Sequence, residues 1–535
     1  MRIFKKIINK RHSNLGGYFS FASVLFLLIA SYFFSNKWYL SSDSSFYNQI
    51  SKQIIRNEKI AVSVETMNDR PVQYSQLFFI QNAIFAMFLG EEYYQIIIFF
   101  ISIFSVLILA HIFSAKEKSL YKFLIPVFAL FYFSSGFFRL IARYKIEAIT
   151  YLLILVMFYL FTRKKSIQSF YFFSFLVGIT IALKQPHLTF LAFIPLYVFL
   201  KLKNLPLKKK IKHLFFSLCL VFLTAFPFYL VMKASTNFFL GVPSMRIPYL
   251  DDIKISLPNV EKTKFCYQSD SFNEDIQMIK RNSARPANSL FAIITSFAGR
   301  NTLTNFIPMA IYLLIFLLLA LYFRKKMKME MIFCLALIVL AILSYEKVVH
   351  IWTYFVYANF IFDALFLGCL FLYFKEKLKT KKPIYLLMVA LILFLIPGAI
   401  NNNANQSHNK LTVKKLKEAR NYVNQSTFAL SSRPYETGDY LNIKTIEAQQ
   451  KNFDYLTDTN KSWDRLYQSF LAKNPNEFLF YSQEMGINTV IEYKLIKRGG
   501  KFPDPVKFFK EKNLLKEIIN NESVSIYQIN YEEND

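Results

Sequence analysis

Apolar segments of about 20 residues recur along most of this chain, and short polar segments rich in lysine and arginine separate them. A helix of about 20 residues crosses the roughly 30 Å hydrocarbon layer of a bilayer. The pattern therefore predicts an α-helical polytopic membrane protein with about eleven transmembrane helices. The expected spans are 18–34, 94–114, 121–138, 147–162, 167–183, 186–200, 213–233, 304–323, 331–346, 350–373 and 383–399.

The stretch 76–90 needs a separate interpretation. It is apolar, but Gln81 and Asn82 interrupt it and Glu91 and Glu92 follow it. Because acids without nearby cations fit an outer position, we expect a helix that lies in the outer interface rather than a span. With this choice the dense clusters of cations fall on the inner side, as the positive-inside rule requires. Counting the stretch as a span would place them outside.

The chain is expected to divide near residue 402. Residues 1–401 form the predicted transmembrane domain, with outer loops at 35–93 and 234–303. Residues 402–535 are predicted to form a small extracytoplasmic α+β domain, because apolar runs give way there to a soluble pattern. Its expected strands have β-branched and aromatic composition and lie at 478–481, 489–493 and 524–529.

Composition and charge agree with a membrane protein. Of the 535 residues 54% are hydrophobic and only 19% are charged, whereas about a quarter are charged in a typical soluble protein. The net charge of +29 does not indicate nucleic acid, because many of the cations sit in short clusters between apolar runs. The excess suits contact with anionic membrane lipids or a lipid phosphate. We expect the cytoplasmic membrane of a bacterium, with the N-terminus in the cytoplasm.

Ionisable side chains beside or within spans are costly and are candidates for function. Cations around one or two acids suit a phosphate leaving group with a general base beside it. The expected outer surface gathers such a set, made of Asp43, Tyr47, Arg56, Asp69, Arg70, Arg139, Arg143, Lys145, Glu147, Lys184, His187, Arg246, Tyr345, Glu346, Lys347 and His350.

Plainer roles exist for several of these residues. Asp43 also suits a cap for a helix over 46–57. Arg143 also suits an interfacial anchor whose guanidinium reaches the headgroups. His187 and His350 fit hydrogen-bonded interfacial histidines better than metal ligands. Lys184 lies in a very short turn between two expected spans, which favours a role in binding phosphate.

Short motifs carry a resemblance to a known family. They are Asp43-(x)3-Tyr47 and Arg70-Pro71-(x)2-Tyr74 in the first outer loop, Arg143-(x)3-Glu147-Ala148 at a span entrance, and Ala182-Leu183-Lys184-Gln185-Pro186 between two spans. On these motifs and its C-terminal segment, the chain resembles the GT-C superfamily of integral-membrane glycosyltransferases. The likeness is to bacterial members related to protein O-mannosyltransferases and aminoarabinose transferases.

The resemblance implies a function and a role for each motif. A sugar linked to polyprenyl phosphate would pass, with inversion, to a lipid, glycan or protein acceptor on the outer face of the membrane. Asp43 would be the general base. Arg143, Lys184, Arg70 and His350 would bind the donor phosphate, and Tyr47, Glu147, Tyr345 and Tyr354 would contact substrate. Relatives often carry two adjacent acids where Ser44 follows Asp43 here, so we expect no bound metal and no other cofactor.

Two other functions remain open at this point. A polysaccharide polymerase or O-antigen ligase is also a multi-span protein with cationic outer loops, but we expect it to lack the early acid and the C-terminal domain. A lipid or glycan transporter predicts charged or broken helices at mid-membrane in two matching halves. Asp363 is the one strong acid in the middle of a predicted span, so the transporter is the weaker alternative.

Overall fold

The computed structural model describes residues 22, 25, 42–57, 60, 63–64, 70–71, 76–90, 93–114, 121–134, 146–236, 249, 252–257, 309–345, 352–377, 407–424, 426–431, 433–447, 474–494 and 509–531. The contacts divide the chain into two compact units. The first comprises Met1–Asn36, Glu92–Phe226 and Ile279–Asn405, and the second comprises Lys37–Glu91, Pro227–Met278 and Gln406–Asp535. Each unit is described by itself below.

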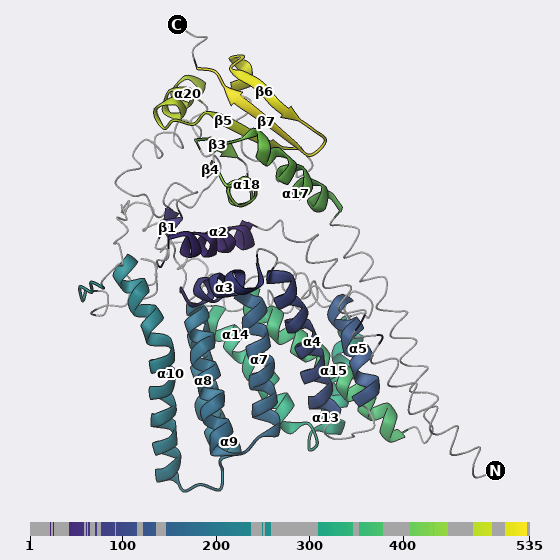
Figure 1. Cartoon of the computed structure of the whole chain (residues 1–535). Coiled ribbons are helices and arrows are strands. Elements are labelled where there is room, and N and C mark those ends of the chain that lie inside the picture. The colour runs from purple at the N-terminus through teal and green to yellow at the C-terminus, as the bar shows by residue number, and fades with distance from the viewer. Residues whose placement is uncertain are drawn as a thin grey trace, which may run out of the picture. The chain divides into compact units, whose positions relative to one another are not determined.

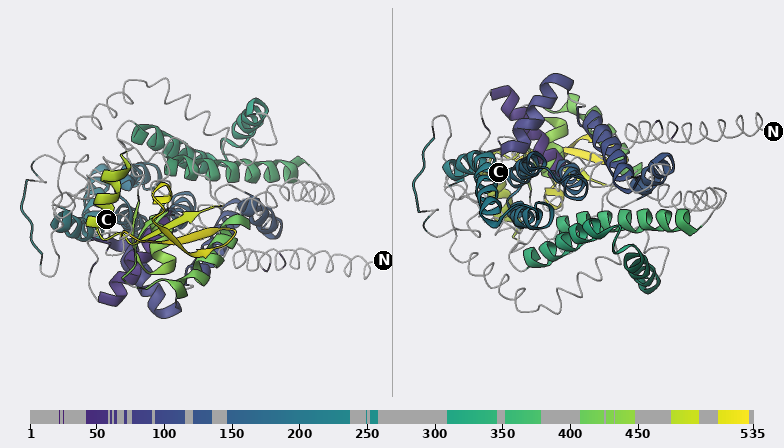
Figure 2. Two further views of the ribbon diagram at one scale, coloured as in Figure 1. Left: turned by 90° about the horizontal axis from the view of Figure 1, so that it is seen from above. Right: turned by 90° about the horizontal axis from the view of Figure 1, so that it is seen from below.

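The first unit is helical. Its elements are α4 (Tyr93–Ser114), α5 (Tyr121–Ser134), α7 (Ile146–Arg163), α8 (Ile167–Leu183), η3 (Gln185–Ala192), α9 (Phe193–Lys201), most of α10 (Leu207–Thr236), α13 (Met309–Phe323), α14 (Lys328–Tyr345) and α15 (Trp352–Lys377). Helix α7 lies between α4 and α8 (Figure 1), and a view from below shows α7 and α8 close to end-on (Figure 2).

Aromatic side chains form the centre of this unit. The ring of Phe161 on α7 lies 5.4 Å from that of Phe333 on α14 and 5.8 Å from that of Tyr197 on α9. Phe193 approaches Phe333 to 4.7 Å between ring centroids. All of these side chains are buried, and such aromatic pairs add stability beyond the area that they bury. They hold α7, α9 and α14 together.

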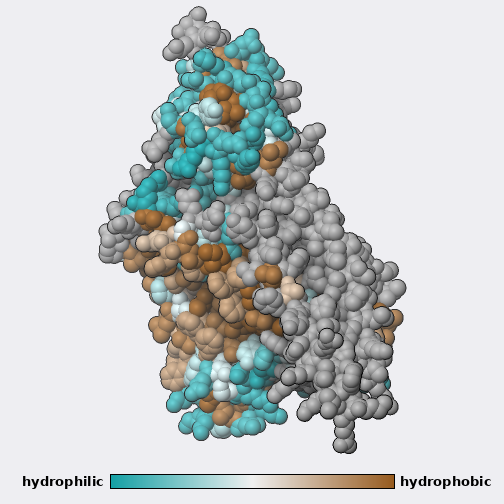
Figure 3. Space-filling model, turned by 45° about the vertical axis from the view of Figure 1, so that its right-hand side comes forward, coloured by the Kyte–Doolittle hydropathy of each residue, from teal (hydrophilic) through white to brown (hydrophobic). Residues whose placement is uncertain are grey.

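The outward faces of the helices remain apolar. Large side chains such as Phe172, Phe199, Phe215 and Leu223 are exposed. One face of the helical unit shows a hydrophobic band above a hydrophilic end (Figure 3). Within the described residues three helices are long and apolar enough to cross a membrane, over Tyr93–Ser114, Ile146–Arg163 and Leu207–Ser235. An exposed apolar surface of this kind is expected where lipid covers it.

The helices follow the predicted spans closely, with one difference. Residues 186–200 were expected to be one span, and the apolar helix His187–Lys201 begins with the 3-10 turns of η3 and continues as α9. The backbone is extended at Lys184, which ends α8 and precedes η3. Pro186 stands in the first turn of η3, where its missing N–H costs no helical hydrogen bond. The expected spans 18–34 and 383–399 lie almost wholly outside the described residues.

The second unit contains the first polar segment of the chain. Helix α2 (Ser42–Asn57) is followed by the short antiparallel pair β1 (Ser63–Val64) and β2 (Arg70–Pro71), and then by α3 (Gln76–Leu89). The 76–90 stretch is therefore helical, as expected; its place at the membrane interface stays a prediction. The side chains of Met87 and Phe88 at its end are 69% and 83% exposed, which suits contact with lipid.

The C-terminal part of this unit is built on a five-stranded sheet in the order β4-β3-β5-β7-β6. Strands β3 (Phe428–Ser431), β4 (Lys444–Glu447) and β5 (Thr489–Tyr493) are parallel, and β7 (Val524–Ile529) pairs antiparallel with β5 and with β6 (Leu515–Asn520). Helix α17 (Ser407–Ala419), η5 (Arg420–Tyr422), α18 (Pro434–Leu441) and α20 (Pro475–Glu484) accompany the sheet.

The expected strands 489–493 and 524–529 are confirmed as β5 and β7, but the expected strand 478–481 is wrong. Those residues belong to α20. The side chain of Asn474 accepts a hydrogen bond from the Glu477 N–H, and Pro475 occupies the first turn. A capped start with proline favours a helix more strongly than aromatic composition favours a strand. Phe478 then enters the core, with its ring 5.7 Å from that of Phe509.

Candidate functional site

The proposed base, Asp43, lies in the first turn of α2, because this helix begins at Ser42. The expected helix over 46–57 is therefore longer by one turn. Tyr47, one turn after Asp43, is buried, and its ring lies 5.3 Å from Phe78 and 5.7 Å from Phe79 on α3. The Oγ of Ser51 lies near the Phe79 carbonyl, at 3.4 Å. These contacts fix α2 against α3.

A buried ion pair joins two other predicted site residues in the first unit. Lys184 Nζ donates to Glu147 Oε1 at 2.7 Å, and the two side chains are only 8% and 10% exposed. Glu147 lies in the first turn of α7, where the helix dipole favours a negative charge. Lys184 lies where α8 ends, and its extended backbone allows its side chain to reach α7. The structure therefore brings these two residues together.

His187, which follows Lys184 closely in the sequence, lies in the interior of the first unit. Its Nδ1 donates to the carbonyl oxygen of Thr180 at 2.9 Å, and its ring lies 5.9 Å from that of Phe190. The side chain is fully buried. A hydrogen-bonded position in the turn after α8 agrees with the plainer of the two roles expected for it.

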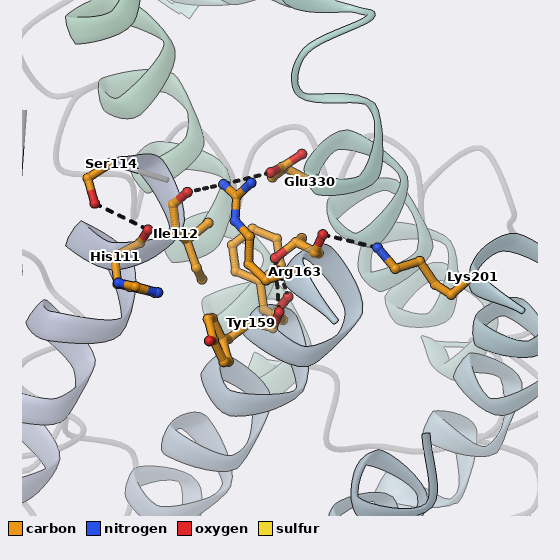
Figure 4. A network of polar contacts seen from close by, with 9 residues as sticks. His111, Ile112, Ser114, Tyr159, Arg163, Lys201 and Glu330 are labelled. Atoms are coloured by element: carbon orange, nitrogen blue, oxygen red, sulfur yellow. Dashed lines mark hydrogen bonds and ion pairs between the residues drawn. The ribbon is translucent and has the colours of Figure 1, made fainter. Parts of the chain in front are cut away.

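Sequence reasoning missed a second polar centre, at the other end of α7 (Figure 4). Arg163 forms an ion pair with Glu330 of α14 at 3.1 Å and also donates to the Ile112 carbonyl of α4. Lys201 of α9 donates to the Thr162 carbonyl at 3.0 Å, which satisfies a terminal carbonyl of α7. A lone acid beside a cluster of cations, Glu330 after Arg324, Lys325 and Lys326, was the available sequence signal.

The other predicted site residues are described less fully. Arg143 and His350 lie outside the described residues. Arg70 is in β2, Tyr345 ends α14 and Tyr354 lies in α15, and only their backbones are described. Within the part of the chain that the structure describes, no group of three or more His, Cys, Asp or Glu side chains is placed to hold a metal ion.

Comparison with known proteins finds the fold. No protein-family model matches the sequence, and no curated protein matches it. Among solved structures, ArnT from Cupriavidus metallidurans, an aminoarabinose transferase, matches with a TM-score of 0.54 at 9% identity, over 94% of this chain and 97% of that one. The same enzyme bound to undecaprenyl phosphate matches with a TM-score of 0.52 at 9% identity, over 95% and 97% of the two chains.

A second enzyme has a related structure. The oligosaccharyltransferase AglB from Archaeoglobus fulgidus, in complex with an inhibitory peptide and a dolichol-phosphate, matches with a TM-score of 0.51 at 11% identity, over 88% of this chain and 69% of that one. Both enzymes are GT-C glycosyltransferases, and the resemblance found in the sequence motifs is confirmed at the level of fold. The chain has the fold of the GT-C membrane glycosyltransferases.

Proposed function

We propose that this protein transfers a sugar from a polyprenyl-phosphate-linked donor to a lipid, glycan or protein acceptor at the outer face of the bacterial cytoplasmic membrane. The observation that carries the proposal is the match to ArnT over almost the whole of both chains, including ArnT with a bound polyprenyl phosphate. The apolar outer faces of the helices suit the polyprenyl chain.

In the proposed reaction Asp43 takes the proton from the acceptor hydroxyl. The acceptor oxygen then forms a bond to the anomeric carbon of the sugar, while the bond from that carbon to the phosphate oxygen breaks and the phosphate leaves with the electron pair. A single displacement of this kind inverts the anomeric carbon. A positioned general base contributes about 100- to 10,000-fold to the rate.

The leaving phosphate needs positive charge beside it. We assign this role to Lys184, Arg143, Arg70 and His350. Of these four residues, Lys184 is the one whose side-chain contacts the structure describes. Glu147 Oε1 holds Lys184 Nζ at 2.7 Å, and both side chains are buried. A phosphate that approaches Lys184 meets an ammonium group whose direction is already fixed, and preorganised charge of this kind is usually the largest single contribution to catalysis. Glu147, Tyr47, Tyr345 and Tyr354 are assigned to substrate contact.

The topology belongs to the same proposal. Residues 1–401 form a domain of about eleven spans, with the N-terminus in the cytoplasm, and residues 402–535 lie outside the cytoplasmic membrane. The chemistry requires no metal, because one carboxylate and several cations supply the base and the charge.

The test compares Asp43→Asn with wild type and with a deletion strain. Surface lipids, glycans and glycoproteins of the host are analysed by mass spectrometry, after immunoblotting shows that each variant accumulates in the membrane. We expect one sugar to be missing in both the deletion and the Asp43→Asn strain, and its mass identifies the donor class. The matched control is Glu418→Gln on α17, an exposed acid paired only with nearby lysines in the described structure.

Each other outcome argues against a part of the proposal. A wild-type glycan profile with Asp43→Asn, together with a loss in the deletion, would exclude Asp43 as the base. A deletion that shortens a polymer without losing a sugar type would favour a polymerase or ligase. Accumulation of an unflipped lipid-linked precursor would favour a transporter.

A further inference from the structure

Helix α2 is held on two sides within the second unit. One side, with Tyr47 and Ser51, faces α3. Another side, with Asn48 and Lys52, faces α18, so that α2 lies between α3 and α18 in Figure 1. Ile50 is fully buried and Gln49 is 5% exposed, an unusual degree of burial for a polar helix that follows a predicted span.

The contact with α18 centres on one carboxylate. Oδ1 of Asp439 accepts a hydrogen bond from Asn48 Nδ2 at 2.7 Å and one from Lys52 Nζ at 2.9 Å. Asn48 and Lys52 are four residues apart and therefore lie on the same face of α2. The Asp439 side chain is 1% exposed, whereas that of Lys52 is 43% exposed. A buried acid that meets two donors on one helix face fixes both the rotation of α2 and its position along the helix axis.

The two helices also approach closely. A Cβ atom at Gly438 would lie 3.0 Å from Gln49 Oε1 and 3.2 Å from the Oγ1 of Thr445 on β4. A side chain at this position would require the Gln49 amide or the Thr445 hydroxyl to move. Glycine therefore lets α18 approach Gln49 of α2 closely, beside the Asp439 contact.

Helix α18 is itself fixed to the sheet. The Oγ1 of Thr437 lies 2.8 Å from Ser431 Oγ at the end of β3 and 2.8 Å from the Tyr493 hydroxyl at the end of β5. Arg433 forms an ion pair with Glu436 at 3.0 Å across the start of the helix. Helix α18 thus transmits the position of the sheet to α2.

We propose that Asp439 is a positioning residue for the transfer reaction, and that the C-terminal part of the chain sets the place of the catalytic base through the contact of α18 with α2. Asp43 lies five residues before Asn48 on the same helix, about 7.5 Å along its axis, so a shift of α2 at Asp439 moves Asp43. A displacement of about 1 Å at a reacting group can lower the rate about 100-fold. This inference rests on the proposed function.

The first test measures how tightly α2 is held and needs no assay of the transfer reaction. Hydrogen exchange is measured by mass spectrometry on the full-length protein in detergent, for wild type, Asp439→Asn and Lys52→Gln. We expect the amides of 42–57 to exchange at least about 10-fold faster in Asp439→Asn, because one donor–acceptor pair loses its charge and α2 opens more easily. The matched control, Glu418→Gln, removes an acid from the same unit that bonds to Lys415, and α2 should exchange as in wild type. Unchanged exchange in Asp439→Asn would overturn the inference.

The second test separates positioning from folding. The exchanged pair Lys52→Asp with Asp439→Lys restores an ion pair in the same place and should recover the slow exchange of α2 and most of the glycan that either single variant loses. Once the donor is identified by its mass, we expect Asp439→Asn to lower kcat about 10-fold or more with donor KM within about twofold of wild type. A rise in donor KM with kcat unchanged would assign Asp439 to donor binding and overturn the inference.

The two proposals fail in different ways. If Asp439→Asn speeds hydrogen exchange in α2 while neither it nor Asp43→Asn alters the glycans, then Asp439 holds α2 in place but Asp43 is not the base. If Asp43→Asn removes the glycan while Asp439→Asn alters neither exchange nor kcat, the proposed function stands and the positioning role is wrong.

Discussion

Glu147 and Lys184 form a buried ion pair, and we expect their contributions to the free energy of unfolding to be strongly coupled. Lys184→Met removes the ammonium group and leaves the carboxylate of Glu147 in a site where its side chain is 10% exposed. Glu147→Gln leaves the ammonium of Lys184 in a site where that side chain is 8% exposed. Each single variant therefore buries a charge that has lost its partner, whereas the double variant removes both charges.

The burial sets the magnitude. Removing one partner of a buried pair costs about 3–5 kcal/mol, mostly because the remaining charge stays desolvated. Replacing both partners by neutral groups costs far less, and we expect the coupling energy of the double-mutant cycle to exceed about 2 kcal/mol. The pair Lys326–Glu376, in the same unit, has side chains that are 58% and 30% exposed; an exposed pair contributes about 0–1 kcal/mol, so the corresponding cycle is the internal control.

The assay is reversible unfolding of the purified protein in mixed micelles with increasing SDS, followed by tryptophan fluorescence and circular dichroism. The cycle comprises wild type, Lys184→Met, Glu147→Gln and the double variant. If the two single effects add to within about 0.5 kcal/mol, the residues do not form a buried pair and the reasoning is refuted. A coupling as small as that of Lys326 with Glu376 would show that water reaches the site.

Two further predictions concern packing and pH. Gly368→Ala on α15 should lower stability by about 1–3 kcal/mol in the same SDS titration, because a Cβ atom there would overlap the ring of Phe113 on α4. Adding Phe113→Leu should recover part of the loss. A neutral effect of Gly368→Ala would contradict this packing. Burial raises the pKa of Tyr493. The folded state therefore keeps the hydroxyl proton at a pH, near about 10, at which the unfolded chain loses it. Because of this difference, the free energy of unfolding should fall as the pH rises above about 10. Tyr493→Phe, which loses the bond to Thr437 and about 1 kcal/mol at neutral pH, should show a shallower alkaline decrease of the thermal midpoint; equal slopes would contradict the assignment.

The membrane helices could be predicted well because their signal is local. Helices α4, α7 and α8 begin and end within one residue of the expected spans 94–114, 147–162 and 167–183, since an apolar run long enough to cross the bilayer can satisfy its backbone only as a helix. The 3-10 turns of η3 that precede α9 were not predicted, although Pro186 stands in the first of them.

The soluble strands were predicted less evenly. Residues 489–493 are a strand because β-branched and aromatic residues, nearly all buried, lie between two partner strands. Residues 478–481 have similar composition but follow Asn474 and Pro475, and this helix start decides their structure. Local composition was ambiguous there, and the capping residues outside the segment carried the information.

The candidate site shows the same division between local and tertiary information. The sequence by itself predicted which segments form apolar helices, because hydropathy acts locally, and it supplied the candidate site residues, whose roles stay predictions. Only the tertiary structure decided which charged residues pair. Lys184 pairs with Glu147, Arg163 with Glu330 and Lys52 with Asp439, and the two residues of these pairs are 37, 167 and 387 positions apart in the sequence. An ion pair forms only where packing brings two charges together and removes water from between them, and that depends on the path of the whole chain rather than on its neighbouring residues.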